Sequence, residues 1–372
     1  MKVCVDIQSA VAQPAGVGRY TRQLIRHLSL TANQHQLSLF YFDFKRVGIT
    51  FDTPNATLLP MRWLPGRLVQ TSWKMLNWPP FEQLAGPADV YHFPNFIAPP
   101  LRAARAVVTI HDLGFLRFPE FTEDRNCAYL SARIGNTVRR AAAIITVSRF
   151  TAQELQELLN VNPDRIFPIH SGMAETFSRP SQEKINAVLH KFGLDRPYLL
   201  SVGTIEPRKN YPFLVEIFEH LASFDGYLVI VGSLGWKYDP ILERIRHSPA
   251  AQRIRLVNYA DDSVLPALYA GAELLAMPSF YEGFGFPPLE AMACGTPVVS
   301  SRAGSLGEIL DQAALLLDGF DREQWLHAIE SVLTDSHLRQ TLIAAGRQHT
   351  KRFSWIETAT QTWGVYARAA AT

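Results

Sequence analysis

Cysteine is scarce in this sequence of 372 residues, which contains only Cys4, Cys127 and Cys294. The three are widely separated, and none belongs to a Cys-x-x-Cys pair or to a cluster with histidine. A disulfide framework needs paired cysteines, and a structural zinc site needs ligands at short spacings. The pattern therefore predicts neither feature and favours a reducing, cytoplasmic compartment.

Long hydrophobic runs are also missing. No stretch reaches the roughly 18 continuous apolar residues of a membrane-spanning helix. The opening residues MKVCVDIQSA lack the apolar core of a signal peptide. We therefore expect any membrane contact to be peripheral, on the inner face of the plasma membrane.

An excess of one charge is lacking as well, because the formal net charge is only +2. Residues 1–180 nevertheless hold 19 Lys and Arg against 13 Asp and Glu. A basic first half suggests an anionic partner or a membrane surface. We do not expect nucleic acid as a partner.

Short apolar runs rich in β-branched residues recur along the chain and alternate with longer helical patterns. The predicted strands fall into two sets: residues 3–7, 88–93, 106–112 and 142–148, then 198–203, 227–232, 254–259, 274–279 and 296–301. Strands that are apolar on both faces and separated by helices are typical of parallel sheets. The sequence thus predicts an α/β protein with two doubly wound, Rossmann-like domains, which suits the chain length.

The alternating pattern breaks near 172–196, and we expect the joint between the domains there. The first domain is expected at 1–178 and the second at 179–354. The sequence predicts a last amphipathic helix over 355–372, which we expect to return to the first domain. Ligands of such sheets bind beyond the carboxyl ends of the strands.

The segment 274–301 predicts a strand, a glycine-rich turn and a helix that begins at Pro287 and Pro288. Proline suits the first turn of a helix, because its missing N–H has no intrahelical partner there. Backbone donors at this positive helix end form an anion site. They belong to Gly283, Phe284, Gly285, Phe286, Leu289 and Glu290. Glu282 and Glu290 flank the site as acceptors for sugar and ribose hydroxyls; the alternative is a solvated Glu282 and a Glu290 that only complements the helix dipole.

A second cluster, GTIEPRKN at 203–210, follows the strand at 198–203. Arg208 and Lys209 offer a bidentate fork beside a point charge, which suits a diphosphate. The alternative is a solvated basic pair. Cations at a helix N-terminus oppose the helix dipole, so a bound anion explains their placement better.

In the first half, Gly16, Gly18 and Arg19 follow the strand at 3–7 after a long loop. Their spacing is not the GxGxxG of a nicotinamide site. At a helix start they face either a phosphate or an acceptor, or they form a turn with a solvated arginine.

His111 ends the strand at 106–112, where α/β proteins place ligand contacts. A single histidine is more often structural. His92 and His170 occupy similar strand ends and compete for the same role.

Aromatic and basic residues alternate over residues 61–81. They are Trp63, Trp73 and Trp78 with Arg62, Arg67 and Lys74. Such segments suit membrane interfaces and lipid-linked acceptors. The alternative is a lid or helix packed on the first domain.

These motifs resemble those of the family 4 glycosyltransferases of GT-B fold, over essentially the whole chain. The resemblance rests on VGTIEPRKN, on the Glu-x7-Glu pattern within YEGFGFPPLE and on the closing FSW. TIHDLGF and VSRFTAQEL resemble the subgroup that contains mannosyltransferases of bacterial O-antigen assembly. The implied fold is two facing Rossmann-like domains with a cleft between them, the first on the acceptor side and the second binding the donor.

The resemblance implies catalytic roles for four residues. Glu282 and His111 would contact the transferred sugar, and Arg208 and Lys209 would bind its diphosphate. Glu290 would hold the donor ribose. The other implied donor contacts are Gly283, Phe284, Gly285, Phe286, Leu289, Gly203, Gly16, Gly18, Arg19, Asn258, Tyr259, Gly232 and Ser233.

The implied activity is transfer of a hexosyl group, with retention, to a glycan or lipid-linked oligosaccharide in lipopolysaccharide (O-antigen) synthesis. Subgroup resemblance favours GDP-mannose or a GDP-deoxyhexose as donor. The sugar nucleotide is a substrate, and no metal or other cofactor is expected. The alternatives are a UDP-hexose donor and, in a different reaction class, a GT-B sugar-nucleotide epimerase.

Overall fold

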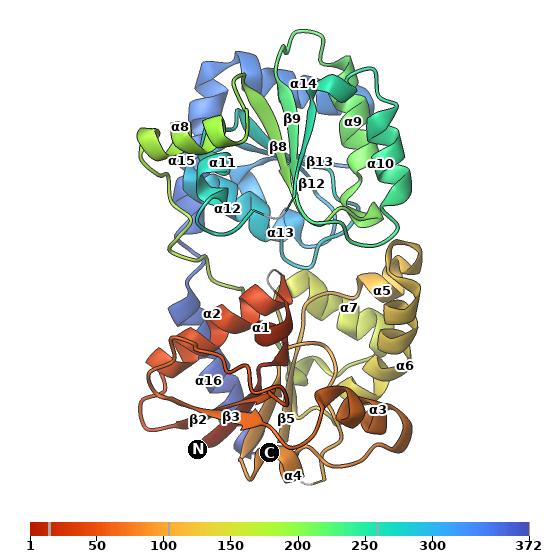
Figure 1. The fold of residues 1–372 in the computed structure, drawn as a ribbon, viewed down its shortest axis with the longest axis vertical. Helices are drawn as coiled ribbons and strands as arrows, with labels where there is room; N and C mark the ends of the chain where they lie inside the picture. The colour runs from red at the N-terminus through yellow and green to blue at the C-terminus, as the bar shows by residue number, and fades with distance from the viewer. Residues whose placement is uncertain (14–15, 103–104, 259, 372) are drawn as a thin grey trace. The chain divides into compact units, whose positions relative to one another are not determined.

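The computed structural model describes residues 1–13, 16–102, 105–258 and 260–371. Contacts between residues divide the chain into two compact units, whose segments Figure 1 traces by colour. The first unit holds Met1–Leu113, Ala128–Gly172 and Ser354–Thr372, and the second holds Gly114–Cys127 and Met173–Phe353. Each unit has its own parallel sheet, so the predicted class of two doubly wound sheets is confirmed.

The first unit contains a seven-stranded sheet in which every pair of neighbours is parallel. The strand order is β3-β2-β1-β4-β5-β6-β7. The strands are β1 (Lys2–Asp6), β2 (Gln36–Phe42), β3 (Ala56–Met61), β4 (Val90–Phe93), β5 (Arg105–Ile110), β6 (Ala143–Thr146) and β7 (Ile166–Pro168). Strands β4 and β6 are buried along their whole length, which is why their sequences lack polar alternation.

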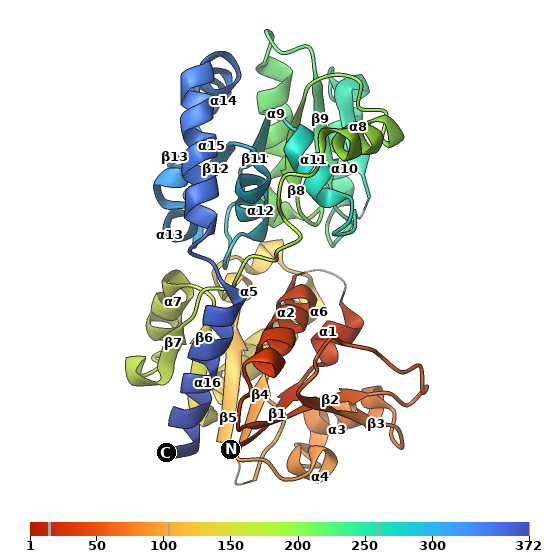
Figure 2. The same ribbon diagram turned by 90° about the vertical axis from the view of Figure 1, so that its left-hand side faces the viewer.

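Helices connect and cover these strands. They are α1 (Gln8–Ala12), α2 (Val17–Leu30), α3 (Gly66–Leu76), α4 (Glu82–Ala85), α6 (Asp124–Arg140), α7 (Arg149–Leu159) and α16 (Trp355–Ala371). The last of them, α16, packs against α2 and against strands β4 to β6 (Figure 2). Gly172 leaves room for this helix, because a Cβ there would lie 2.2 Å from the Trp355 backbone nitrogen.

The second unit contains a six-stranded parallel sheet in the order β10-β9-β8-β11-β12-β13. The strands are β8 (Tyr198–Val202), β9 (Tyr227–Val231), β10 (Ile254–Val257), β11 (Leu274–Met277), β12 (Val298–Ser301) and β13 (Leu315–Leu317). All five residues of β9 are buried, as a strand covered on both faces requires.

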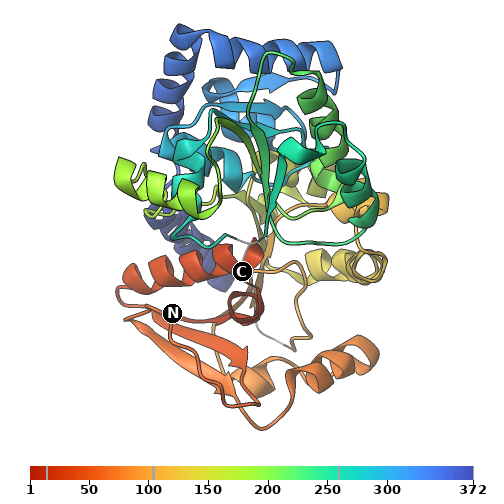
Figure 3. The ribbon, with the colours of Figure 1, turned by 45° about the horizontal axis from the view of Figure 1, so that its top comes forward.

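Helices lie on both faces of this second sheet. They are α8 (Gln182–Lys191), α9 (Tyr211–His220), α10 (Asp239–Arg246), α11 (Leu265–Gly271), α12 (Phe286–Cys294), α13 (Leu306–Leu310), α14 (Arg322–Thr334) and α15 (Ser336–Thr350). Helices α9 and α10 cover one face, and α8, α11 and α12 cover the other (Figures 1 and 3). An apolar cluster joins α9, α10 and α14 to the strands, with Trp325 fully buried in it.

All nine predicted strands are present, and the residues that the structure describes hold four further strands that were not predicted. Strands β3, β7 and β13 lie at sheet edges, where burial is partial and the apolar signal is weak. Pro60 also makes a strand at 56–61 hard to predict, because proline is disfavoured inside sheets. The structure accommodates it because β3 is an edge strand. The long loop expected before Gly16 contains helix α1 instead.

The segment 114–127 belongs to the second unit, although the sequence expectation put it inside the first domain at 1–178. It contains the short helix α5 (Gly114–Arg117) and a single turn of 3-10 helix. The Trp236 indole donates a 2.6 Å hydrogen bond to the Phe121 carbonyl, and the Phe121 ring stacks on Phe280. Aromatic packing therefore holds this segment against the second unit.

The tryptophans of segment 61–81 have different environments. Trp73 donates a hydrogen bond to the Pro79 carbonyl and packs against Phe42 and Phe81. Trp63 and Trp78 are 66% and 56% exposed. Within the described ranges, no helix has both the length and the apolar character that crossing a bilayer requires.

A buried hydrogen-bond chain ties α16 to the sheet of the first unit. The Nδ1 of His92 lies 2.7 Å from the Tyr366 hydroxyl, and its Nε2 lies 2.8 Å from the Thr109 hydroxyl. Burial, with a smaller contribution from His111, lowers the pKa of His92 to about 3. The ring is therefore neutral at physiological pH.

This burial predicts a pH dependence of stability. The unfolded chain protonates His92 near pH 6.5, whereas the folded chain does not. The unfolded state thus gains a proton as the pH falls, and folding loses about 2 kcal/mol between pH 6.5 and pH 5. The free energy of unfolding, measured by urea titration at pH 7.5 and pH 5, should fall less in His92→Gln than in the wild type. An equal fall in the free energy of unfolding of the two proteins would contradict the assignment of this pH dependence to His92.

Candidate functional site

Four loops meet at the carboxyl edge of the second sheet. The Gly203 N–H donates to the Val231 carbonyl, and the Gly232 N–H donates to the Val257 carbonyl, both at 2.9 Å. The ends of β8, β9 and β10 are thereby held side by side. On the far side of β8, the loop after β11 is tied in by a 2.9 Å hydrogen bond from the Phe280 N–H to the Arg208 carbonyl.

Two glycines make the close approach of these loops possible. A Cβ on Gly232 would lie 2.0 Å from the Gly203 carbonyl oxygen, which no real side chain tolerates. A Cβ on Gly203 would lie 2.9 Å from the Cε of Lys209. Backbone packing therefore explains glycine by itself at position 232, whereas the contact at Gly203 is with the far end of a lysine side chain.

A compact charge cluster lies where these loops meet. The Lys209 Nζ is 2.6 Å from Oε1 of Glu282, and the Arg208 Nη1 is 2.8 Å from Oε2 of the same carboxylate. Arg208 also donates from Nη2 to Oε1 of Glu206 at 2.6 Å and from Nη1 to the Tyr281 carbonyl at 2.7 Å. The structure thus joins the three residues Arg208, Lys209 and Glu282, which the sequence had placed in two separate motifs.

The charge state of Glu282 follows from this arrangement. Burial by itself would raise the pKa of the carboxyl group, but Arg208 and Lys209 outweigh it and lower the pKa to about 2. Glu282 is only 6% exposed and is ionised throughout the physiological range. Both cations are needed, because a buried carboxylate that loses a partner is strongly destabilising.

Glu206 is a member of the cluster that sequence reasoning missed. It is 1% exposed, and its Oε2 is buried without a hydrogen-bond partner among the described residues. The sequence did offer a signal, because Glu206 stands in the same strand-to-helix turn as Arg208. A carboxylate two residues before an arginine in a tight turn is positioned to orient the guanidinium.

The predicted helix after the glycine-rich turn is confirmed as α12. It begins at Phe286, includes two prolines in its first turn and ends before Gly295, which has a positive φ of 84°. Gly285 precedes it at a φ of 95°, and no side chain caps the helix N-terminus. The N-cap residue Gly285 therefore offers no side-chain acceptor to the backbone N–H groups of the first turn.

Glu290 lies in the first turns of α12 and is 2% exposed. Its Oε2 accepts a 2.8 Å hydrogen bond from the Tyr269 hydroxyl of α11. The sequence had not identified Tyr269, because its role depends on the packing of α11 against α12. Glu290 is thus held by a neighbouring helix in addition to any interaction with the helix dipole.

The other predicted contacts of the second unit differ in position. Gly283, Phe284 and Gly285 are buried in the turn before α12, and Leu289 is part of the core. Ser233 follows Gly232 after β9, and its carbonyl accepts a hydrogen bond from Ile205. Asn258 follows β10 and is exposed, while Tyr259 lies outside the described residues.

In the first unit, His111 follows β5 and lies beside α2. Its Nε2 is 2.8 Å from the Pro94 carbonyl, and its ring contacts Tyr20 edge-on. Burial lowers the pKa of His111 despite the hydrogen bond to Pro94. His92, which competed for the same role, is enclosed by Thr109 and Tyr366 and is a structural residue.

The predicted turn at Gly16, Gly18 and Arg19 forms the start of α2. Gly16 is the residue before the helix, with a φ of 56°, and Gly18 is buried. A Cβ on Gly18 would lie 2.0 Å from the Gln13 carbonyl oxygen, so close backbone approach by itself explains this glycine. Arg19 is partly buried and has an interaction partner, which excludes the fully solvated arginine of the alternative.

Sequence comparisons match both halves of the chain. The family described as "Glycosyltransferase Family 4" matches residues 14–176, and "Glycosyl transferases group 1" matches residues 183–349. "O-antigen chain mannosyltransferase B" of Escherichia coli is 32% identical over 98% of this chain and 99% of its own length. "Serotype-specific mannosyltransferase WbdA" of Escherichia coli is 34% identical over 59% of this chain, but over only 28% of WbdA.

Solved structures share the fold at low sequence identity. Sucrose-phosphate synthase from Thermosynechococcus elongatus has a TM-score of 0.79 at 21% identity, covering 100% of this chain and 99% of that one. HepE of Anabaena, solved with UDP-glucose, has a TM-score of 0.74 at 18% identity and covers 99% of both chains. WaaG, described as a glycosyltransferase of lipopolysaccharide biosynthesis, has a TM-score of 0.70 at 16% identity, covering 97% of this chain and 98% of that one.

Gly304 provides a test of how the backbone positions Glu282. Its φ is +63°, and a Cβ there would lie 2.5 Å from the Glu282 carbonyl oxygen and 2.7 Å from its nitrogen. Gly304→Ala should therefore displace the Glu282 peptide and lower the free energy of unfolding by about 2 to 4 kcal/mol, from strain and overpacking together. Gly319 is the matched control, because its φ is +82° and nothing lies within 4 Å of a Cβ there. Gly319→Ala should lower the free energy of unfolding by only about 1 kcal/mol. Equal losses in urea titrations would contradict the proposed contact.

Proposed function

This chain belongs to the family 4 glycosyltransferases, and from that membership we propose that it transfers mannose from GDP-mannose, with retention, to a growing lipid-linked glycan. The similarity to "O-antigen chain mannosyltransferase B" along nearly the full length of both chains supports mannose and O-antigen assembly. The proposed donor site rests on one observation, the Arg208–Lys209–Glu282 cluster beside the N-terminus of α12.

The cluster supplies groups for both parts of a sugar nucleotide. The Lys209 Nζ has three N–H donors, and Glu282 is its one hydrogen-bond partner among the described residues. Two donors remain for a diphosphate oxygen while the ion pair stays intact. We assign the diphosphate to Lys209, Arg208 and the amides before α12, the transferred sugar to Glu282, and the ribose to Glu290.

The base and the outer phosphate contacts complete the proposed donor site. Asn258 and the peptide at Gly232 and Ser233 stand at adjacent strand ends and are the proposed contacts of the base, together with Tyr259. Gly203 borders the Lys209 side chain. On the first unit, Gly16 to Arg19 are proposed to contact a phosphate or the acceptor at the start of α2.

The chemistry needs stabilisation of a departing diphosphate. The bond between the anomeric carbon and the β-phosphate oxygen breaks, and that oxygen keeps the electron pair. Preorganised cations and backbone amides stabilise such developing charge without a metal ion. The acceptor hydroxyl attacks the anomeric carbon from the face that the diphosphate leaves, and its proton passes to the departing phosphate oxygen.

His111 is proposed to contact a substrate hydroxyl. Its Nε2 faces a carbonyl, which can only accept, so Nε2 carries the proton of the neutral ring. Nδ1 then carries a lone pair, and His111 acts as a hydrogen-bond acceptor. Its lowered pKa suits this role, because a protonated ring would have no lone pair to offer.

The surface around α3 is proposed as a peripheral membrane contact. Its exposed apolar side chains are Trp63, Leu68, Met75, Leu76 and Trp78. Arg67 and Lys74 on the same helix are also exposed and complement anionic headgroups. A lipid-linked acceptor would then be presented at the membrane surface.

The proposed reaction is tested by incubating the protein with labelled GDP-mannose and a set of lipid-linked oligosaccharides, with the product linkage read by NMR. Lys209→Ala and Arg208→Ala should each lower kcat by about 100- to 1000-fold, the usual effect of removing one preorganised donor. Circular dichroism of the variants checks that the fold remains. Lys184→Ala, an exposed lysine on α8, is the matched control and should keep wild-type turnover.

Three results would contradict the proposal. Full turnover in both cluster variants would remove the diphosphate assignment. Transfer from a UDP-hexose but not from GDP-mannose would replace the donor. Release of an isomerised sugar nucleotide in the absence of any acceptor would identify an epimerase instead.

Membrane contact is tested by flotation with liposomes that contain phosphatidylglycerol. Trp63→Ser combined with Trp78→Ser should reduce the floated fraction severalfold, because each exposed ring loses its interfacial burial. Leu256→Ser combined with Ile356→Ser is the control, since both residues are exposed outside segment 61–81. Unchanged flotation of the tryptophan variant, or an equal loss in the control, would show that the surface around α3 does not bind the membrane.

A further inference from the structure

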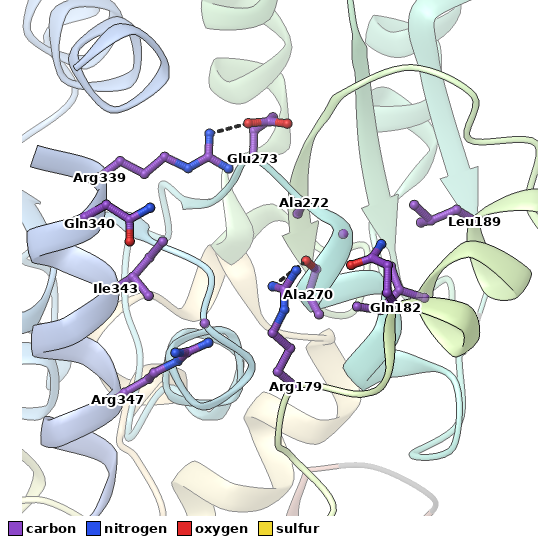
Figure 4. Close-up of a pocket in the computed structure, with 13 residues that line it drawn as sticks. Arg179, Gln182, Leu189, Ala270, Ala272, Glu273, Arg339, Gln340, Ile343 and Arg347 are labelled. Atoms are coloured by element: carbon purple, nitrogen blue, oxygen red, sulfur yellow. Dashed lines mark hydrogen bonds and ion pairs between the residues drawn. The ribbon is translucent and has the colours of Figure 1, made fainter. Parts of the chain in front are cut away.

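A cavity lies in the second unit, lined by residues other than those of the charge cluster. Its volume is about 430 Å³, which is the size range of small-molecule sites. One wall is formed by α15, the opposite wall by the segment 179–189, and the back by the chain between α11 and β11 (Figure 4).

The cavity carries an excess of positive charge. Arg179, Arg339 and Arg347 line it, and Glu273 is the single carboxylate among the lining residues. Arg339 forms an ion pair with Glu273, and the dashed contact in Figure 4 marks it. Among the described residues, no carboxylate forms an ion pair with Arg179 or Arg347, so the cavity suits a ligand with two negative charges.

Arg179 and Arg347 enter the cavity from opposite walls. Arg179 donates from Nη1 to the Ala270 carbonyl at 3.0 Å. Within the described part of the chain, the guanidinium of Arg347 has no hydrogen-bond or ion-pair partner, although it lies over Gly295 at the end of α12. The dipole of α12 accounts for one cation at this position. The carboxyl end of α11 accounts in the same way for Arg179, which bonds the Ala270 carbonyl there, so two helix ends bring two cations to one cavity.

The remaining lining supplies the contacts that a sugar needs. Gln182 and Gln340 stand on the two walls as amide donors and acceptors for hydroxyls, and Ile343 and Leu189 offer apolar surface (Figure 4). We propose that this cavity binds a phosphomonoester of sugar size, with its phosphate held by Arg179 and Arg347. The proposal goes beyond the transfer reaction and does not depend on the identity of the donor.

The walls of this cavity are connected to the donor side by short contacts. Arg179 is bonded to Ala270 near the end of α11. Phe177, two residues before Arg179, packs against Tyr269, whose hydroxyl holds Glu290. A phosphate that draws Arg179 from the Ala270 carbonyl acts on the end of the helix that positions Glu290. Occupancy of the cavity is therefore coupled to nucleotide binding.

The test is isothermal titration calorimetry of the full-length protein with mannose 6-phosphate, and with mannose as the uncharged control. The wild type should bind the phosphate and not mannose. Arg179→Gln combined with Arg347→Gln should weaken binding at least tenfold, because two charge-assisted contacts are lost. Arg246→Gln combined with Arg322→Gln removes the same charge from exposed positions outside the cavity and should bind like the wild type.

Two further arms exclude other sites and other sources of the phosphate. Lys209→Ala should still bind mannose 6-phosphate, whereas loss of binding there, or full competition by GDP, would place the phosphate in the donor site and overturn the proposal. Vesicles with phosphatidic acid should not compete, and binding of vesicles instead of the sugar phosphate would assign the cavity to a lipid headgroup. Equal binding by the wild type and the Arg179/Arg347 variant would also overturn the proposal.

The coupling is measured as the Kd of GDP with and without saturating mannose 6-phosphate. A severalfold change in the wild type, absent in the Arg179/Arg347 variant, is the expected result, and the reciprocal titration should give the same factor. An unchanged Kd would overturn the coupling. The circular dichroism spectrum and GDP binding of the variant show that it remains folded.

Discussion

The Glu282 carboxylate is buried, and it remains charged only because Arg208 and Lys209 both contact it. Removing either cation would leave a buried charge with half of its compensation. The loop after β8 and the loop after β11 must therefore keep a fixed position relative to each other. The ion pair of Glu206 with Arg208 and the hydrogen bond from Phe280 to Arg208 help to hold that position.

The parallel sheet supplies the place for this cluster. In a parallel sheet all the carboxyl ends lie along one edge, so adjacent strands bring loops together that are far apart in sequence. Glu282 and Lys209 are 73 residues apart in the sequence, yet the Lys209 Nζ lies 2.6 Å from Oε1 of Glu282. Glycines at Gly203, Gly232 and Gly304 let the backbones approach closely enough for that contact to form.

Part of the site could be predicted from local sequence. The Gly-rich turn followed by two prolines predicted α12, which the structure contains. The adjacent Arg208 and Lys209 predicted a diphosphate contact, which stays a prediction, and their shared contact with Glu282 was not foreseen. Glu206 and Tyr269 were not identified, because a buried carboxylate and a tyrosine acquire their roles only through neighbours on other elements. Trp73 and Trp78 have similar sequence surroundings, yet packing on Phe42 and Phe81 partly buries Trp73, whereas Trp78 is exposed.

The sequence by itself determined the two parallel sheets, the helix at the glycine-rich turn and the membership of a glycosyltransferase family. These features follow from hydrophobic periodicity and from motifs that are a few residues long. Only the tertiary structure decided that Glu282 is shared by two cations, that Tyr269 holds Glu290, and that Arg179 and Arg347 face one cavity. Each of these contacts joins residues many positions apart, and their distances are set by how the strands and helices pack.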